Sequence, residues 1–252
     1  MIFGIDFPPI THAVEWKNLF GGDTFGVNKV VLLMWLTVII VFAFFFIASR
    51  KRDLVPTGLQ NVAESSVDFV RNGIILETMG EDGLPWTPFL LSMFSFIFVC
   101  NIWEIIPIAQ MPVNARIALP AFMAIIVWLL YMYVGIAKNG FFHFFGGAIF
   151  PPGVPKALYL LVTPIELVQL LIVRPLSQSV RLFANMLAGH LLLISFAVLS
   201  TALFEATYIG AALPGALLVA LTGFEVLVAF LQAYIFTILT AVYIGSSMHP
   251  EH

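Results

Sequence analysis

The feature that most constrains this chain is a series of apolar runs that are each long enough to cross a lipid bilayer. Residues 30–48, 86–107 and 117–137 form three such runs of about 20 residues, the length that a helix needs to span the hydrocarbon core. Only 10% of the 252 residues are charged, whereas a soluble domain carries about 25%. Too few polar side chains remain to cover a water-facing surface, so the sequence predicts an all-α integral membrane protein.

Two further apolar stretches are unusually long. Residues 158–204 form a stretch of 47 residues, and residues 213–245 form one of 33. At 1.5 Å per residue the second is about 50 Å long against a hydrocarbon core of about 30 Å, so its helix must tilt strongly or bend. The first is either two crossings or one long oblique element, because Pro164 and Pro175 permit kinks. A single oblique element gives five crossings.

The charges at the ends of the runs predict the orientation. Residues 50–52 are all basic and follow the first run, which marks its cytoplasmic end. The N-terminal segment 1–29 is then expected outside, the loop 138–156 inside, and the tail 247–252 inside if there are five crossings. Segment 1–29 lacks the basic and apolar regions of a signal peptide, so we expect the first run, 30–48, to be kept as an anchor.

Between the first two runs, residues 55–80 predict an amphipathic helix on the cytoplasmic face. Apolar residues recur at helical spacing, namely Leu59, Val62, Ala63, Val67, Val70 and Ile74. The polar side is more acidic than basic, which makes anionic lipid a poor partner. A protein partner and a simple interfacial spacer both fit the pattern. The remaining segments are expected to be a two-helix membrane hairpin, 86–137, and a tilted hairpin, 157–246.

The composition excludes several classes of function. No basic patch suggests nucleic-acid binding. Cys100 is the only cysteine, which excludes an intramolecular disulfide and a cysteine-rich metal site. No phosphate-binding glycine loop and no histidine cluster with metal-ligand spacing occurs. We therefore expect no cofactor, no metal, no nucleic acid and no catalytic site of the chain's own.

The last two stretches align their polar residues if they form an antiparallel hairpin. Closing the hairpin at residues 205–212 makes the position numbers of facing residues sum to about 417. The register then places three pairs approximately level, Arg181 with Gln232, His190 with Glu225, and Glu166 with His249 near the cytoplasmic surface. Arg181 falls close to the middle of the membrane.

Arg181 is the residue that most strongly predicts function. A guanidinium at mid-membrane costs about 2.5–3.5 kcal/mol on insertion scales, and its pKa is too high for deprotonation to relieve that cost. No Asp or Glu lies at its depth on any of the five predicted crossings. An internal ion pair or a side chain that reaches the surface is therefore the weaker interpretation. The sequence predicts that the counter-charge lies on another polypeptide.

His190 and Glu225 are predicted to form a titratable pair. An imidazole and a carboxylate at one level pass a proton by way of water, although a static buried salt bridge also fits. Nine residues separate Arg181 from His190, which is about 900° of rotation, so the two face opposite sides of the helix. Asn185 lies one turn from Arg181. It is expected either to hydrate the site or to bond a neighbouring helix.

Other polar residues of the runs are candidate channel lining. Glu166, Gln169 and Ser177 share one face at the inner end of the hairpin, where they predict a second aqueous opening. A glutamate that simply reaches cytoplasmic water is an equal alternative for Glu166. Glu104 and Asn101, near the outer end of the second run, have the same two interpretations. Two inlets that meet beside a permanent cation describe a proton path that is not a continuous pore.

These residues resemble a known family. RPLSQSVRLFANMLAGH at 174–190, followed by FEVLVAFLQAYIFTILTAVY at 224–243, is similar to subunit a of the F-type ATP synthase membrane sector. The chain matches the family pattern [KR]-P-x-S-x-x-[LV]-R-L-F-[GA]-N-M-x-A-G throughout. The resemblance favours one oblique element for 158–204. In some members an acidic residue follows A-G and a histidine lies seven positions before the glutamine. Here the order is His190 and then Glu225, which preserves the pair.

The resemblance implies a role for each of these polar residues. Arg181 is expected to face a rotating ring of c subunits, each with a mid-membrane carboxylate. The outer half-channel and the neighbourhood of the arginine would then hold Asn185, His190, Glu225 and Gln232, and the inner half-channel would hold Glu166.

The resemblance also implies a function and its partners. The chain is expected to be a stator subunit whose two offset aqueous half-channels couple a proton gradient to ATP synthesis. Peripheral-stalk b subunits, the other ATP synthase subunits and the lipid bilayer are the further expected partners, in a bacterial inner membrane. The alternative is an autonomous secondary transporter in which Arg181 holds an anionic substrate. That alternative predicts internal repeats, which the sequence lacks.

Overall fold

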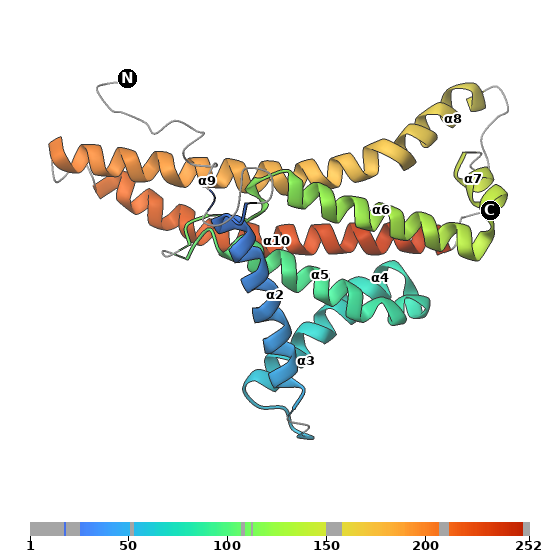
Figure 1. The fold of residues 1–252 in the computed structure, drawn as a ribbon, viewed down its shortest axis with the longest axis horizontal. Helices are drawn as coiled ribbons and strands as arrows, with labels where there is room; N and C mark the ends of the chain where they lie inside the picture. The colour runs from blue at the N-terminus through green and yellow to red at the C-terminus, as the bar shows by residue number, and fades with distance from the viewer. Residues whose placement is uncertain are drawn as a thin grey trace. The chain divides into compact units, whose positions relative to one another are not determined.

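The computed structural model describes residues 18, 26–50, 53–106, 109–111, 113–149, 158–206 and 212–248, and most of these are helical (Figure 1). The long helices are α2 (Lys29–Ala48), α5 (Thr87–Ile102), α6 (Ala118–Asn139), α9 (Arg174–Ala206) and α10 (Ala212–Met248). The shorter helices are α3 (Leu59–Val70), α4 (Leu76–Thr78), α7 (Phe141–Ile149) and α8 (Tyr159–Val168). Two π-helical turns, η1 (Arg71–Ile75) and η5 (Gln169–Val173), and two 3-10 turns, η2 (Gly80–Trp86) and η3 (Val113–Ala115), complete the described elements.

Five helical segments of the described chain are long and apolar enough to cross a membrane. They are Lys29–Ala48, Gly80–Ile102, Ala118–Asn139, Tyr159–Phe204 and Ala212–Met248. The predicted all-α membrane fold with two long C-terminal elements is therefore confirmed. The segment Tyr159–Phe204 is one element of 46 residues, so the single-element alternative for this stretch holds.

Two local predictions differ from the structure. The second apolar run, 86–107, is not helical to its end, because α5 stops at Ile102 and turns follow over 103–106. Proline at 107 disfavours helical backbone in the residue before it. The expected loop 138–156 contains α7, which begins directly after Gly140. Gly140 has a φ of 78°, ends α6 by donating its N–H to Ile136, and accepts from the N–H of Phe144.

The predicted amphipathic helix is present as α3, η1 and α4, but its buried face is displaced. Ala63, Val70 and Ile74 are buried as expected, whereas Leu59 and Val62 are each 53% exposed. Gln60 is buried in their place, with its amide nitrogen donating to the Asp53 carbonyl at 3.0 Å and to a Glu64 carboxylate oxygen at 2.8 Å. Hydrogen bonds from the Gln60 amide nitrogen therefore override the apolar pattern at the start of this helix. Its location at a membrane face stays a prediction.

The chain divides into two compact units. The first comprises Met1–Ala43, Ser95–Arg116 and Leu182–Ala233, and the second comprises Phe44–Phe94, Ile117–Arg181 and Tyr234–His252. Helices α2, α5, α9 and α10 contribute residues to both units. Each unit has its own core and is described separately below.

In the first unit α2 and α5 are joined through one hydroxyl. The indole N–H of Trp103 donates to Oγ1 of Thr37 at 2.7 Å, and that hydroxyl donates to the Leu33 carbonyl at 2.8 Å. The thiol of Cys100 lies 3.8 Å from the same oxygen. Thr37 and Cys100 are fully buried. A satisfied hydroxyl of this kind helps to fix the pairing of two largely apolar helices.

In the second unit aromatic rings connect the helices. Phe69 of α3 lies 5.5 Å from the ring of Phe94 and 5.8 Å from that of Tyr234, between centroids. At Gly135 of α6 any side chain would overlap the ring of Phe144, so glycine permits α6 and α7 to pack closely. Aromatic pairs at these separations contribute beyond the area that they bury.

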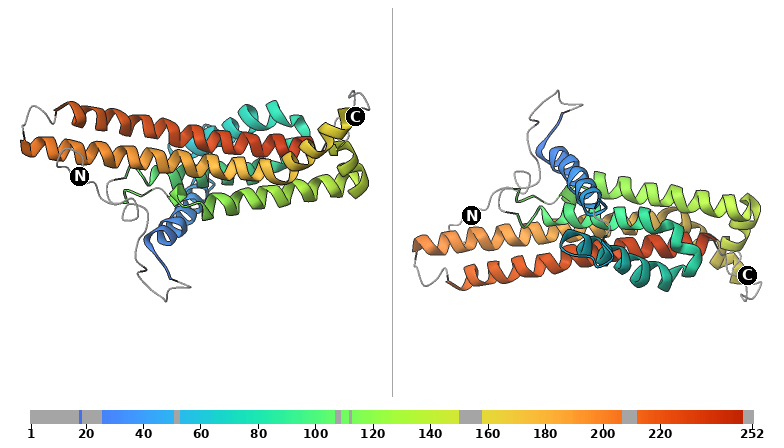
Figure 2. Two further views of the ribbon diagram at one scale, coloured as in Figure 1. Left: turned by 90° about the horizontal axis from the view of Figure 1, so that it is seen from above. Right: turned by 90° about the horizontal axis from the view of Figure 1, so that it is seen from below.

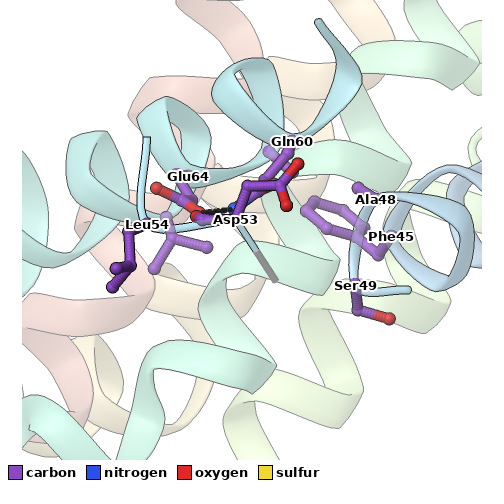
Figure 3. A pocket seen from close by; sticks show the side chains of 9 residues that line it. Phe45, Ala48, Ser49, Asp53, Leu54, Gln60 and Glu64 are labelled. Atoms are coloured by element: carbon purple, nitrogen blue, oxygen red, sulfur yellow. Dashed lines mark hydrogen bonds between the residues drawn. The ribbon is translucent and has the colours of Figure 1, made fainter. Parts of the chain in front are cut away.

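A pocket of about 410 Å³ lies beside α3 and the last turns of α2, within the second unit. Phe45, Ala48 and Ser49 line one side, and Asp53 and Gln60 lie opposite them (Figure 3). The side-chain oxygen of Gln60 is buried without a hydrogen-bond partner in the described part of the chain. The pocket involves none of the residues that the sequence predicts for transport.

Candidate functional site

The α9–α10 hairpin has the register that the sequence predicts. In the first unit the amide nitrogen of Asn185 donates to the Gln232 side-chain oxygen at 2.8 Å. In the second unit the Gln178 amide donates to Oγ1 of Thr240 at 3.0 Å. The position numbers of these pairs sum to 417 and 418, against the predicted 417. Figure 2 shows the two helices side by side in both views. Matching polar residues across the hairpin therefore fix its alignment.

Glu225 packs directly against the backbone of α9. A side chain on Gly189 would overlap the Glu225 carboxylate, so only glycine leaves room for it. Glu225 is 4% exposed, and one of its carboxylate oxygens has no hydrogen-bond partner among the described residues. The amide nitrogen of Gln232 is also buried and has no hydrogen-bond partner among the described residues. Such groups are costly to bury dry, so each is a natural position for a water molecule, and the Glu225 oxygen can also accept a proton.

His190 pairs with a different acid from the one that the sequence predicts. Its Nδ1 lies 3.6 Å from Oε1 of Glu104, and both side chains are buried. The predicted partner, Glu225, instead lies against Gly189. The prediction considered two helices only, whereas Glu104 follows the end of α5 and comes from outside the hairpin.

The His190–Glu104 pair borders a cavity of about 400 Å³ in the first unit. Polar groups line it together with apolar side chains of α9 and α10, and the polar ones include Lys29, Gln110 and Thr222. The ammonium of Lys29 donates to the Ala109 carbonyl at 2.6 Å. Sequence reasoning missed these three residues. Only the position of Lys29 directly before an apolar run signalled its place at a helix end.

Asn101 forms hydrogen bonds with two other parts of the chain. Its amide nitrogen reaches the Ala229 carbonyl at 3.4 Å, and its oxygen accepts from the Asn114 amide at 2.6 Å. Asn101 and Asn114 are both buried. The amide links α5 to α10 and to η3, as polar side chains between membrane helices do. Channel lining by Asn101 stays a prediction.

Arg181 has no ion pair and no hydrogen bond from its side chain to any described residue. It is half-buried on α9, next to the fully buried Leu182. The predicted level partner, Gln232, is instead bonded to Asn185, one turn further along α9. The described part of the chain therefore provides no counter-charge for this guanidinium.

The inner candidates lie around the π turn η5, in the second unit. Glu166 is half-buried and Gln169 is exposed, while the Ser177 hydroxyl donates to the Arg174 carbonyl at 3.2 Å. The prediction that Ser177 shares a face with Glu166 and Gln169 assumed an unbroken α-helix, which the π turn interrupts. A π turn adds one residue, which rotates the preceding segment by about 100°. His249, the predicted neighbour of Glu166, lies outside the described residues.

Comparison with known proteins identifies the family. Residues 31–245 match the family model described as ATP synthase A chain. The chain is 42% identical to ATP synthase subunit a of Frankia alni over 247 residues, which cover 96% of this chain and 86% of the relative. It is 41% identical to that of Rhodococcus erythropolis, covering 97% and 88%, and 40% identical to that of Rhodopseudomonas palustris, covering 96% and 98%. The chain therefore belongs to the ATP synthase A chain family, as a multi-pass, non-catalytic, proton-translocating stator subunit of the Fo membrane sector.

Proposed function

We propose that the chain forms two offset aqueous half-channels and conducts protons to and from the carboxylates of a rotating ring of c subunits. The proton gradient is thereby coupled to ATP synthesis, which takes place on other subunits. The observation that carries the proposal is the unpaired charge of Arg181. Its guanidinium stays charged, lies in a long apolar helix, and has no partner within the described chain. Its counter-charge must come from outside these residues, and a passing c-subunit carboxylate fits.

The outer half-channel is built from residues of the first unit. The 400 Å³ cavity admits water to the Glu104–His190 pair. Glu104 and Glu225 each have a carboxylate oxygen without a hydrogen-bond partner among the described residues, so each can bind a water or a proton. From Glu225 the path continues by way of the Asn185–Gln232 amide pair, one helical turn from Arg181.

Arg181 controls the exchange with the ring. A protonated ring carboxyl that approaches a guanidinium loses its proton more readily, because the cation favours the carboxylate. The same positive charge repels a hydrated proton and so prevents direct leakage between the half-channels. The proton leaves through the inner half-channel, to which we assign Glu166 and Gln169.

The expected assembly follows from the same assignment. The N-terminus lies outside, the C-terminus lies in the cytoplasm, and the membrane is a bacterial inner membrane. The segments keep their predicted roles: an outer segment 1–29, a first membrane helix 30–48, an interfacial helix 55–80, two hairpins 86–137 and 157–246, and a tail 247–252. Partners are the c-ring, peripheral-stalk b subunits, the remaining synthase subunits and lipid.

The test is Arg181→Ala in the complete synthase, with Lys138→Ala as the control because Lys138 is an exposed cation at the end of α6. We expect Arg181→Ala to abolish ATP-driven proton pumping into inverted vesicles while the complex still assembles. Lys138→Ala should pump at the parental rate. Normal coupled pumping by the Arg181→Ala complex would refute the proposal.

A further inference from the structure

The segment where α8 becomes α9 contains an unusual turn, visible as a bend in Figure 1. In η5 the backbone N–H of Arg174 donates to the carbonyl of Gln169, five residues back instead of four. The Leu170 carbonyl therefore loses its ordinary donor. The next candidate donor is Pro175, which has no N–H. The π turn thus leaves one backbone carbonyl without a donor in an apolar helix, which needs a partner from elsewhere.

Two side chains of α6 supply that partner. The Tyr131 hydroxyl donates to the Leu170 carbonyl at 2.7 Å, and the Trp128 indole N–H donates to it at 3.3 Å. Tyr131 is 1% exposed. Its ring also lies 5.8 Å from that of Tyr243, over which the Arg174 guanidinium stands at 5.1 Å. All these residues belong to the second unit, and Tyr131 contacts both the π turn and the aromatic ring beside it.

The π turn decides which residues share a face with Arg181. An α-helix turns by about 100° per residue, so an unbroken helix places Gln169 about 120° and Glu166 about 60° away from Arg181. One additional residue in a π turn rotates the preceding segment by about 100°. Gln169 then lies within about 20° of Arg181, and Glu166 within about 40°.

Without the π turn, the helix face beside Arg181 would be apolar. In an unbroken α-helix the directions next to Arg181 would be taken by Leu170 and Leu167, at about 20° and about 40°. The π turn therefore exchanges two leucines for a carboxylate and an amide on that face. A π turn that depends on outside donors is a device for setting helical phase.

We propose that Tyr131 is a positioning residue that holds this π turn and so keeps Glu166 and Gln169 on the Arg181 face of the helix. The inference rests on the proposed function, because the inner half-channel to which these side chains belong is part of that proposal. Tyr131 acts through the Leu170 carbonyl and transfers no proton itself.

The first test is Tyr131→Phe in the complete synthase, which removes the hydroxyl and keeps the ring. Tyr133→Phe is the matched control, because Tyr133 is two residues away on α6 and 72% exposed. ATP-driven proton pumping is measured per assembled complex. We expect a rate at least five-fold lower for Tyr131→Phe and no change for Tyr133→Phe.

The second test is rescue by deletion of Leu171. Removing one residue lets the segment form an ordinary α-helix with Glu166 and Gln169 in the same phase as before. The hydroxyl is then no longer needed. In the Tyr131→Phe complex the deletion should restore pumping to at least half of the parental rate. A complex that carries the deletion alone, with Tyr131 intact, should also pump.

Each outcome decides the inference. Parental pumping by Tyr131→Phe, a loss that the deletion fails to restore, or a deletion that is silent with Tyr131 intact overturns the positioning role. Arg181→Ala in the same assay separates the two proposals. If Arg181→Ala pumps normally, the proposed function fails; if it is silent while Tyr131→Phe pumps normally, only the role of Tyr131 is lost.

Discussion

At the scale of single residues, the site depends on space as much as on charge. Glu225 occupies the room that a side chain on Gly189 would need, and this close approach puts a carboxylate directly against α9. The obstructing atoms are the far end of a flexible side chain, which can move without disturbing the backbone. Enlarging Gly189 should therefore displace the carboxylate rather than unfold the protein.

This argument predicts a separation of activity from stability in Gly189→Ala. Pumping should fall several-fold because the Glu225 carboxylate is displaced, whereas the thermal midpoint should hold or rise, since alanine in a helix is favoured over glycine by about 1 kcal/mol. Gly223→Ala is the control, because a methyl group there meets open space. It should raise stability and leave pumping unchanged. A large loss of stability in Gly189→Ala with normal pumping per complex would contradict the assignment.

At the scale of elements, α9 and α10 are aligned by polar contacts, because apolar helices in lipid slide past one another at little cost. In the second unit, Gln178 donates to Thr240 and to the Phe236 carbonyl at 3.2 Å, and all three groups are buried. The Thr240 hydroxyl donates to the same carbonyl at 2.8 Å. This small network fixes the hairpin register within the second unit.

A double-mutant cycle tests that network. Gln178→Ala should lower the free energy of unfolding by about 1–3 kcal/mol, because it removes buried hydrogen bonds. Combining it with Thr240→Val should cost less than the sum of the single changes, with a coupling of about 1 kcal/mol. Thr201→Val is the control, since its hydroxyl is exposed and bonds only within its own helix. Strict additivity in thermal unfolding of the detergent-solubilised complex would show that the contacts do not act together.

At the scale of the whole molecule, the described chain contains a half-buried cation without its counter-ion. Arg181 lacks a counter-charge in the described part of the chain, and carboxylates of the Glu104 and Glu225 side chains keep unfilled hydrogen-bonding capacity. Under the proposed function, such a proton path is complete only when a ring carboxylate carries the proton past the cation.

The corresponding prediction concerns the isolated chain. Reconstituted alone in vesicles, it should conduct no protons under an imposed membrane potential. Adding the c-ring and the other membrane-sector subunits should produce conduction that a fluorescent pH probe reports. Vesicles with the same subunits and Arg181→Ala provide the comparison. Conduction by the chain alone would point to an autonomous transporter instead.

Much of the fold could be predicted from the sequence because lipid imposes simple rules. Apolar length predicted the candidate spans, and a helix in lipid must satisfy its own backbone, so few alternatives remain. The hairpin register followed from the predicted position of the turn, and the Asn185–Gln232 and Gln178–Thr240 contacts have that register. The predicted importance of Arg181 needed only its charge and its surroundings along the chain.

Other features were decided only by the tertiary structure. The partner of His190 is Glu104, which arrives from another part of the chain. The proposed placement of Glu166 and Gln169 on the Arg181 face depends on a π turn whose Leu170 carbonyl accepts hydrogen bonds from Tyr131 and Trp128 of a separate helix. By itself the sequence determined the membrane spans, the C-terminal hairpin and the unpaired charge of Arg181, because these follow from hydropathy and charge along the chain. Only the tertiary structure decided helical phase and the choice among acids, because both depend on which distant groups come within hydrogen-bonding reach.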